Sequence, residues 1–516
     1  MIGKLVELGG FGAEAVVTLT RNGLLAPVPP AALARVVEAY RHFHVTPAAG
    51  VAIAAARWPD RTAVVDEAGS LTFAELDARA AALAAALRHR YDVGPERTVA
   101  VMWPNDRGFP LAVAAVSRLG ADLLLLNTGL AGPRLREVLV REGVDVLIAA
   151  PDLPPVDFDG PCLTDLDGLA RVGSASAAPP PPRRPGRLVL LTSGTTGAPK
   201  GAPRRLSLAA LAEPFVSMLT TVPLRGGEPV LIAPPLFHGL GLLWYAAALV
   251  LGCPVVLVRR FDADAVLDAL AVERAAALVA VPVMLRRLLA RPVRRLPALR
   301  VVVSGGSALP PDLSTAFMDA YGNVLYNLYG STEAGWAALA TPAELRLAPG
   351  TVGRPPRGAT VRVTGPDGAE QPPGEVGRVL VAGGLTFTGA ADGLLPTGDL
   401  GHRDPDGLLF IDGRDDDMIV SGGENVFPQE VEQVLARQPG VADVAVLGVP
   451  DEEYGQRLAA YVVAEEGARP SAEELKKAVR SELAGFKVPR EVVFVASVPR
   501  NQTGKVDRFR LAEQTG

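Results

Sequence analysis

Cysteine and histidine are scarce in this sequence, and their scarcity excludes several kinds of site. The 516 residues include two cysteines, Cys162 and Cys253, and five histidines. Two cysteines cannot supply a disulfide framework or a cysteine-rich metal site. The histidines do not form an H-E-x-x-H pattern, so a catalytic zinc site of that type is not predicted.

Dense basic clusters are also missing. The formal net charge is −5, and without a basic stripe we expect no nucleic-acid partner. The first twenty residues contain one early lysine and are interrupted by Glu7 and Glu14, unlike a secretory signal peptide. The expected compartment is therefore the cytoplasm.

The one long uncharged run, "GLGLLWYAAALVLGCPVVLV" at residues 239–258, has about the length of a membrane span. Gly252-Cys253-Pro254 divides it into a helix-like piece and the β-branched piece "VVLV". We therefore predict a buried helix, a turn and a strand, and no integral membrane segment.

The chain has the alternation typical of an α/β fold. Short apolar runs at 98–103, 122–127, 144–150 and 187–193 predict buried strands, and 73–90 and 110–120 predict helices between them. The alternation repeats at 228–234, 254–261, 277–282 and 299–306. Strands separated by helices predict parallel sheets with both faces covered.

The pattern of predicted secondary structure changes twice towards the C-terminus. Residues 340–412 have short strands and Gly/Pro turns, which predict a small antiparallel sheet or barrel. A mixed α+β segment follows. We predict a large N-terminal domain at 1–413, with a helical extension at 1–56, and a smaller mobile C-terminal domain at 414–516.

The stretch "LLTSGTTGAPKG" at 190–201 joins an apolar strand to three glycines, four hydroxyls and a lysine. Glycines allow backbone N–H groups to approach an anion, and hydroxyls and Lys200 add donors and charge. The spacing differs from G-x-x-x-x-G-K-[ST], because two residues separate Gly197 from Lys200. Taken alone, the stretch also fits a flexible surface loop.

Three further stretches offer groups that suit a nucleotide. "YNLYGSTEAGW" at 326–336 places Tyr329 beside a glycine, two hydroxyls and Glu333, a ring for a base and an acid for Mg²⁺. Asp399, in a Gly-Asp turn, can accept hydrogen bonds from vicinal hydroxyls, and Arg414 can donate to a phosphate or a ribose. Lys505 follows Gly504 near the end of the chain. Each stretch alone also fits a turn, a hairpin or a solvated charge.

In this order, the four stretches resemble the adenylate-forming superfamily of acyl-CoA synthetases, amino-acid adenylation domains and firefly-type luciferases. The pattern is closest to fatty-acid or aryl-acid CoA ligases. Weaker matches at 58–76 and in "PLFHGLG" at 235–241 extend the resemblance from about Trp58 to Arg508, and residues 1–45 lie outside it.

The resemblance implies an ATP-dependent acid–CoA ligase that uses ATP, Mg²⁺ and coenzyme A. It makes Lys505, Thr332 and Glu333 catalytic, with Glu333 also holding the metal. The nucleotide-binding residues that it implies are Thr192, Ser193, Gly194, Thr195, Thr196, Gly197, Lys200, Gly305, Gly306, Ser307, Leu328, Tyr329, Gly330, Ser331, Thr332, Asp399 and Arg414. The acid pocket would comprise His238, Gly239, Gly305 and Trp336. Asp416 would be the hinge between two positions of the C-terminal domain, and Gly422 and Gly423 would leave room for CoA.

Amino-acid-activating members carry an aspartate where this chain has His238, after Phe237. A buried ammonium needs such a partner, so an α-amino acid substrate is disfavoured. No lysine or arginine is evident near the pocket, which favours a hydrophobic monoacid. Two alternatives stay open: an enzyme that stops at the acyl-AMP and passes the acyl group to a carrier protein, and an inactive relative that binds a nucleotide or acyl ligand.

Overall fold

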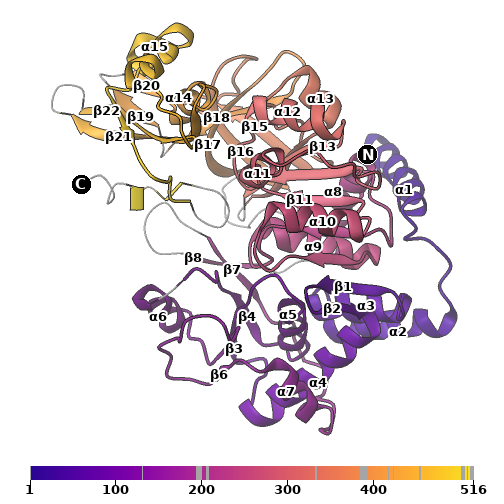
Figure 1. Cartoon of the computed structure of the whole chain (residues 1–516). Coiled ribbons are helices and arrows are strands. Elements are labelled where there is room, and N and C mark those ends of the chain that lie inside the picture. The colour runs from indigo at the N-terminus through magenta and orange to yellow at the C-terminus, as the bar shows by residue number, and fades with distance from the viewer. Residues whose placement is uncertain are drawn as a thin grey trace.

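The computed structural model in Figure 1 describes residues 2–130, 132–192, 200–204, 208–331, 334–383, 393–415, 418–421, 424–451, 455–500, 506–507 and 510–511. For residues 2–11, 192, 200–204, 208–211, 420, 424, 425 and 455, only the backbone is described. No helix within these ranges is long and apolar enough to cross a membrane.

Three helices occupy the start of the chain: α1 (Ile2–Arg21), α2 (Pro30–Phe43) and α3 (Pro47–Arg57). The Thr46 hydroxyl caps α3 by accepting from the Ala49 N–H at 3.4 Å, and Pro47 fills the first helical turn, where no N–H partner is needed. Helix α1 packs on α8 (Leu208–Thr221) and is tied to the body by an ion pair between Glu14 and Arg357.

The first sheet has six strands in the order β6-β5-β3-β4-β7-β8. Its strands are β3 (Thr98–Met102), β4 (Asp122–Leu125), β5 (Val146–Ala149), β6 (Cys162–Leu163), β7 (Leu188–Thr192) and β8 (Lys200–Arg204). All neighbours are parallel except β7 and β8. Helices α4 (Phe73–Tyr91), α5 (Gly108–Arg118), α6 (Gly132–Arg141) and α7 (Leu166–Gly173) belong to this part of the chain.

The second sheet has eight strands in the order β14-β13-β12-β11-β9-β10-β1-β2. They are β1 (Thr62–Asp66), β2 (Gly69–Thr72), β9 (Val230–Ile232), β10 (Val255–Leu257), β11 (Ala277–Ala280), β12 (Val301–Gly305), β13 (Leu325–Ser331) and β14 (Gly335–Ala340). The central strands are parallel and fully buried, as expected for apolar runs covered on both faces.

The helices of this sheet are α9 (Gly239–Leu251), α10 (Ala263–Val272), α11 (Pro282–Leu289), α12 (Pro311–Tyr321) and α13 (Pro342–Leu347). The uncharged run at 239–258 therefore forms α9, a left-handed turn at Gly252 and strand β10. The prediction of a buried helix, turn and strand is confirmed, as is the α/β alternation in both sheets.

The remaining strands form two smaller sheets (Figure 1). The antiparallel sheet comprises β15 (Ala359–Thr364), β16 (Gly377–Gly383), β17 (Leu395–Arg403) and β18 (Leu409–Arg414). The last sheet contains β19 (Ile419–Ser421), β20 (Glu424–Val426), β21 (Val441–Asp451), β22 (Gly455–Ala464) and β23 (Glu491–Phe494), with helices α14 (Pro428–Ala436) and α15 (Ala472–Glu482). A large α/β body is thus followed by an antiparallel sheet and an α+β unit, as predicted.

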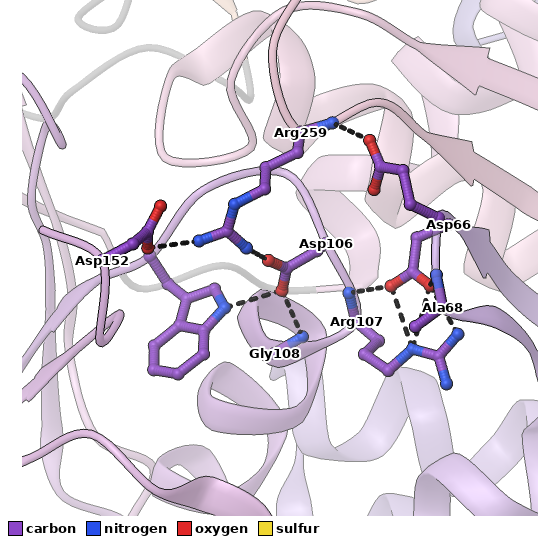
Figure 2. Close-up of polar contacts among 9 residues, drawn as sticks. Asp66, Ala68, Asp106, Arg107, Gly108, Asp152 and Arg259 are labelled. Carbon is purple, nitrogen blue, oxygen red and sulfur yellow. Dashed lines mark hydrogen bonds and ion pairs between the residues drawn. The ribbon is translucent and has the colours of Figure 1, made fainter.

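A polar network connects the two large sheets at the ends of β1, β3, β5 and β10 (Figure 2). Asp66, at the end of β1, accepts from the Arg107 backbone N–H at 2.8 Å and from its guanidinium. Asp106 accepts from Trp103 Nε1 at 2.7 Å and from the Gly108 N–H at 2.8 Å. Arg259, after β10, pairs with both Asp106 and Asp152. We call residues 103–107 and their partners the inter-sheet clamp.

The pKa values of the two aspartates of the clamp shift in opposite directions. Burial alone would raise the pKa of Asp66, but the hydrogen bonds and charge of Arg107 outweigh it, so the net shift is downward. Burial raises the pKa of Asp106 in spite of its hydrogen bonds from Trp103 and Gly108. The Asp66 carboxylate is therefore the more strongly stabilised charge.

Replacing the Asp66 carboxylate tests the clamp. We expect Asp66→Asn to destabilise the folded chain by about 2 kcal/mol, because Arg107 would lose its ionic partner in a largely buried position. The apparent melting temperature, measured by circular dichroism, should fall by several degrees. The exposed Asp157, which pairs with Arg136 at the surface, provides the matched control Asp157→Asn, which should change little. Equal effects of both variants would contradict a clamp role.

Candidate active site

A cavity of about 1960 Å³ lies where the second large sheet, the antiparallel sheet and the C-terminal segment meet. Its walls include Tyr329 from β13, Asp399 from β17 and Arg414 from β18. The C-terminal segment contributes Glu430 from α14 and Asp443 from β21. The cavity thus brings together residues that are far apart in the sequence.

Tyr329, Asp399 and Arg414 form a connected polar group in the cavity wall. The Tyr329 hydroxyl donates to Asp399 Oδ2 at 2.5 Å, and Arg414 Nη1 lies 3.5 Å from Asp399 Oδ1. Asp399 and Arg414 are paired in register on β17 and β18. Burial, then the neighbouring Asp399 charge, raises the pKa of Tyr329, so the phenol stays protonated as a donor. An aromatic ring, a carboxylate and a guanidinium can contact a base, a ribose and a phosphate.

Glycine is required beside Tyr329 on steric grounds. A Cβ at Gly330 would lie 2.0 Å from the Gly335 carbonyl oxygen across the β13–β14 pair. At the next turn, the Ser331 Oγ accepts from the Ala334 N–H at 2.9 Å. Gly330 and Ser331 therefore allow β13 and β14 to pair closely beside the cavity.

Asp399 is oriented by its own strand. The Thr397 hydroxyl donates to the Val379 carbonyl at 2.9 Å and accepts from the Asp399 N–H at 3.1 Å. Gly398 between them has φ +78°, a conformation that favours glycine. The Thr-Gly-Asp sequence therefore fixes a kink that directs the carboxylate towards Tyr329.

The residues predicted for the acid pocket are largely brought together. His238, Gly239, Gly306, Ser307 and Trp336 all line the cavity, and so do Leu328, Gly330 and Ser331. Gly305 is not among the lining residues; a Cβ there would lie 2.9 Å from the Leu328 carbonyl oxygen. The glycine at position 305 is therefore explained by the close packing of its strand against β13.

One indole group and one phenol group in the wall are buried without a hydrogen-bond partner among the described residues. They are Trp336 Nε1 and the Tyr245 hydroxyl. Tyr245 is 2% exposed and lies on α9. Unpartnered buried donors are uncommon and carry a free-energy cost, so a ligand or water is their natural partner.

Asn105 fixes the segment that carries His238, and sequence reasoning missed it. Its Nδ2 donates to the Pro234 carbonyl at 2.9 Å, and its Oδ1 accepts from the Leu236 N–H at 2.8 Å. Asn105 belongs to the loop after β3, in the first large sheet, whereas 234–236 follow β9 in the second. The "WPND" sequence after a buried strand was the available signal, but nothing in it indicates the distant partner.

Basic residues near the cavity were also missed. Arg286 and Arg287 on α11 line it, as does Arg187, which pairs with Asp122. The expectation that no arginine lies near the pocket is therefore wrong for the cavity as a whole. Helix α11 was not singled out because its "LRRLL" pattern resembles any amphipathic helix.

Many of the predicted residues lie outside the described residues. These are Ser193, Gly194, Thr195, Thr196, Gly197, Thr332, Glu333, Asp416, Gly422, Gly423 and Lys505. Thr192 and Lys200 are described by their backbone alone, and they face each other in register on β7 and β8. The two ends of the glycine-rich stretch therefore form an antiparallel pair.

The segment that carries Lys505 begins and ends at the cavity. Arg500 and Val506 form an isolated antiparallel bridge, and both line the cavity together with Asp507. Arg500 is held by Asp443, with Nη2 to Oδ1 at 2.7 Å and Nε to Oδ2 at 3.1 Å. This two-point contact fixes the start of the segment on β21.

Within the described residues, no cluster of three or more His, Cys, Asp or Glu side chains could hold a metal ion. Glu333, the predicted Mg²⁺ ligand, is outside those residues. The placement of Mg²⁺ stays a prediction.

Comparison with known proteins identifies relatives over most of the chain. Residues 51–389 match the family described as AMP-binding enzyme, and residues 430–505 match its C-terminal domain. The chain is 36% identical over 483 residues to an indoleacetate–CoA ligase from Aromatoleum aromaticum, covering 87% of this chain and 94% of the relative. It is 36% identical over 482 residues to a feruloyl-CoA synthase from an Amycolatopsis species, covering 89% and 96%.

Solved structures agree with the sequence relatives. The chain is similar to an o-succinylbenzoate CoA synthetase from Bacillus subtilis in complex with its acyl-adenylate intermediate. The TM-score is 0.80 with 29% sequence identity, covering 90% of this chain and 97% of that chain. The same synthetase in complex with ATP and a magnesium ion gives a TM-score of 0.79 with 28% identity, covering 90% and 99%.

The substitution Tyr329→Phe removes the phenol hydroxyl but keeps the aromatic ring, so it tests the hydroxyl alone. We expect the KM for ATP to rise about 10-fold, since Asp399 would lose a charge-assisted donor while the aromatic face remains. The measurement is acid-dependent pyrophosphate release at varied ATP. Tyr326→Phe is the control, because the hydroxyl of Tyr326 on the same strand has no hydrogen bond with the described residues. An unchanged KM for ATP in Tyr329→Phe would show that this hydrogen bond does not organise the nucleotide site.

Asn105→Ala tests the positioning of the His238 segment. The change would leave the Pro234 carbonyl and the Leu236 N–H buried without partners, at a cost of about 1–3 kcal/mol. We expect a lower melting temperature together with a kcat/KM for the acid reduced about 10-fold. Asn323→Ala, at an exposed position that contacts Arg346, should leave both quantities unchanged. Lost stability with full activity would restrict Asn105 to a structural role.

Proposed function

Since the chain belongs to the family of AMP-binding enzymes and, within it, to the AMP-forming acid–CoA ligases, we propose that it converts a hydrophobic carboxylic acid to its CoA thioester through an acyl-AMP. The acid binds on the side of the cavity formed by α9 and Trp336. The nucleotide binds on the side formed by β13, β17 and β18.

The Tyr329–Asp399–Arg414 group carries this proposal. In a cavity with largely apolar walls on the α9 side, these three side chains supply one oriented carboxylate and one guanidinium. The carboxylate suits the two ribose hydroxyls, which are donors, and the ring offers a face for adenine. Arg414 adds positive charge beside the ribose and phosphates.

The first step is adenylation. A carboxylate oxygen of the acid attacks the α-phosphorus of ATP, the bond to the β-phosphate oxygen breaks, and pyrophosphate leaves. Residues 193–197 and Lys200 are proposed to bind the leaving pyrophosphate, and Thr332 the α-phosphate. Lys505 would neutralise charge that develops between the carboxylate and the α-phosphate. Magnesium bound with ATP supplies further positive charge, with Glu333 as its proposed protein ligand.

The second step is thioester formation. The CoA thiol loses its proton to solvent, its sulfur attacks the acyl carbon, the bond from that carbon to the AMP oxygen breaks, and AMP leaves. We propose that the C-terminal segment changes position between the steps, with the domain boundary at 413/414 and Asp416 as the hinge. Gly422 and Gly423 would then leave space for the pantetheine arm.

Lys505→Ala provides the main test. Purified full-length protein would be given ATP, Mg²⁺, CoA and a panel of aryl and straight-chain acids, with pyrophosphate release and product masses recorded. We expect acyl-CoA and AMP from the parent, and a loss of about 100-fold or more in Lys505→Ala, the scale for removing a group that stabilises transition-state charge. Lys477→Ala, an exposed lysine on α15, should remain within 2-fold of the parent rate.

Other products of this panel would point to other functions. Acyl-AMP that accumulates in the presence of CoA would replace the ligase by an adenylating enzyme that serves a carrier protein. ATP binding without pyrophosphate release for any acid would replace it by an inactive binding relative.

A further inference from the structure

Besides His238 and Trp336, the cavity is lined by a stretch of α9 and by residues from the N-terminal helices. Helix α9 lines it from Gly239 to Val250. The opposite wall includes Gly50 and Ile53 of α3, and Tyr40, His44 and Val45 from the end of α2 and the connection to α3. We call this region the deep arm. Its N-terminal wall lies mostly before residue 51, where the family match begins.

The deep arm starts at the nucleotide site. The position of Gly306, beside Tyr329, is in contact range of Leu240 at the start of α9. From Gly239 to Val250 the helix rises about 16 Å at 1.5 Å per residue. A zigzag chain of ~1.5 Å carbon–carbon bonds advances only about 1.3 Å per bond, so that distance corresponds to roughly a dozen carbons.

Two of the α9 residues that line the arm are accessible, although other positions on the helix are buried. Ala246 and Val250 are exposed, Val250 by 46%, whereas Ala247, Ala248 and Leu249 are buried. Gly50 keeps α3 close to α9, since a Cβ there would lie 3.1 Å from Leu249 Cδ1. The two helices therefore touch on one side and leave room on the other.

The N-terminal wall is held in place by specific contacts. The Ala48 N–H donates to the Ser117 hydroxyl of α5 at 3.3 Å, and the Thr46 hydroxyl donates to the Phe43 carbonyl at 2.7 Å. His44 adopts φ +54°, which is unusual for a residue other than glycine and persists only where the surroundings enforce it. The α2–α3 connection is thus a formed wall of the cavity.

Resting on the proposed function, we propose that the deep arm binds the distal part of an elongated apolar acid, and that residues 40–50 set the longest acid accepted. The whole cavity, nucleotide side included, has a volume of about 1960 Å³, above the roughly 300–1,000 Å³ of ordinary ligand pockets, so it can hold an acid together with a nucleotide. The side chains that α9 presents are leucine, alanine and valine, with Tyr245 the one polar side chain among its lining residues. An alkyl or arylalkyl chain fits this wall.

Filling the arm from each wall provides the test. Ala246→Phe fills it part-way along α9, and Val45→Phe fills it from the N-terminal wall. With straight-chain acids of increasing length, kcat/KM of the parent should rise up to about twelve carbons. Ala246→Phe should lower kcat/KM for the long acids at least 10-fold and leave four- to six-carbon acids within 2-fold. Val45→Phe should affect only the longest acids. Val272→Phe, at an exposed position on α10, is the control and should change nothing.

The outcomes distinguish failure of the deep-arm proposal from failure of the proposed function. If short and long acids are used equally by the parent, or if Val45→Phe matches the parent for every acid, the deep-arm proposal is overturned while the ligase stands. If no acid is activated, the proposed function fails, and the arm is judged by binding alone. A rise in melting temperature with dodecanoic acid that disappears in Ala246→Phe and in Val45→Phe would support the arm, and no rise in the parent would overturn it.

Discussion

Asn105 lies in one large sheet and is hydrogen bonded to the backbone of the other, and the placement of the whole site depends on such directional contacts. Apolar packing between two covered sheets has no preferred direction, so it permits small sliding movements. The amide of Asn105 accepts from Leu236 and donates to Pro234, and the neighbouring Asp106 and Arg107 add ionic contacts to Arg259 and Asp66. A short loop after β3 therefore fixes the register between the sheets.

The second link of this kind runs from the eight-stranded sheet to the antiparallel sheet. The Tyr329 hydroxyl bonds Asp399 across these sheets, so the groups assigned to the nucleotide also connect two structural units. Arg500 and Asp443 perform the same role inside the C-terminal segment. Polar contacts between strands of different sheets thus both assemble the cavity and supply the groups in its wall.

The elements of the fold could be predicted because each depends on local pattern. Buried strands such as 98–102 are uninterrupted apolar runs, and the Gly-Cys-Pro break at 252–254 marks where α9 ends and β10 begins. Tyr329, Asp399 and Arg414 could be singled out because each stands in a short stretch with an unusual combination of groups. Asp399, expected in a turn, lies within strand β17 instead. Asn105 and Tyr245 could not be singled out, since a single buried polar residue has no periodicity, and the backbone partners of Asn105 are distant in the chain. Gly305 was assigned to the pocket with Gly306. In the structure Gly305 packs against the neighbouring strand, whereas Gly306, one residue further along, lines the cavity.

The nucleotide side of the cavity and the deep arm are held by different kinds of contact. The contacts that hold the nucleotide side are polar and directional, so a change in one of them moves its partners as well. The contacts of the deep arm are apolar and non-directional, and Ala246 and Val250 already project from α9 into open space. Side chains on that wall can therefore change in volume without displacing Tyr329 or Asp399. The N-terminal helices line the arm on the side opposite α9, away from the hydrogen bond between Tyr329 and Asp399. On the proposed function, one fixed adenylation site would in this way serve acids of different length, with the length set by residues that take no part in the chemistry.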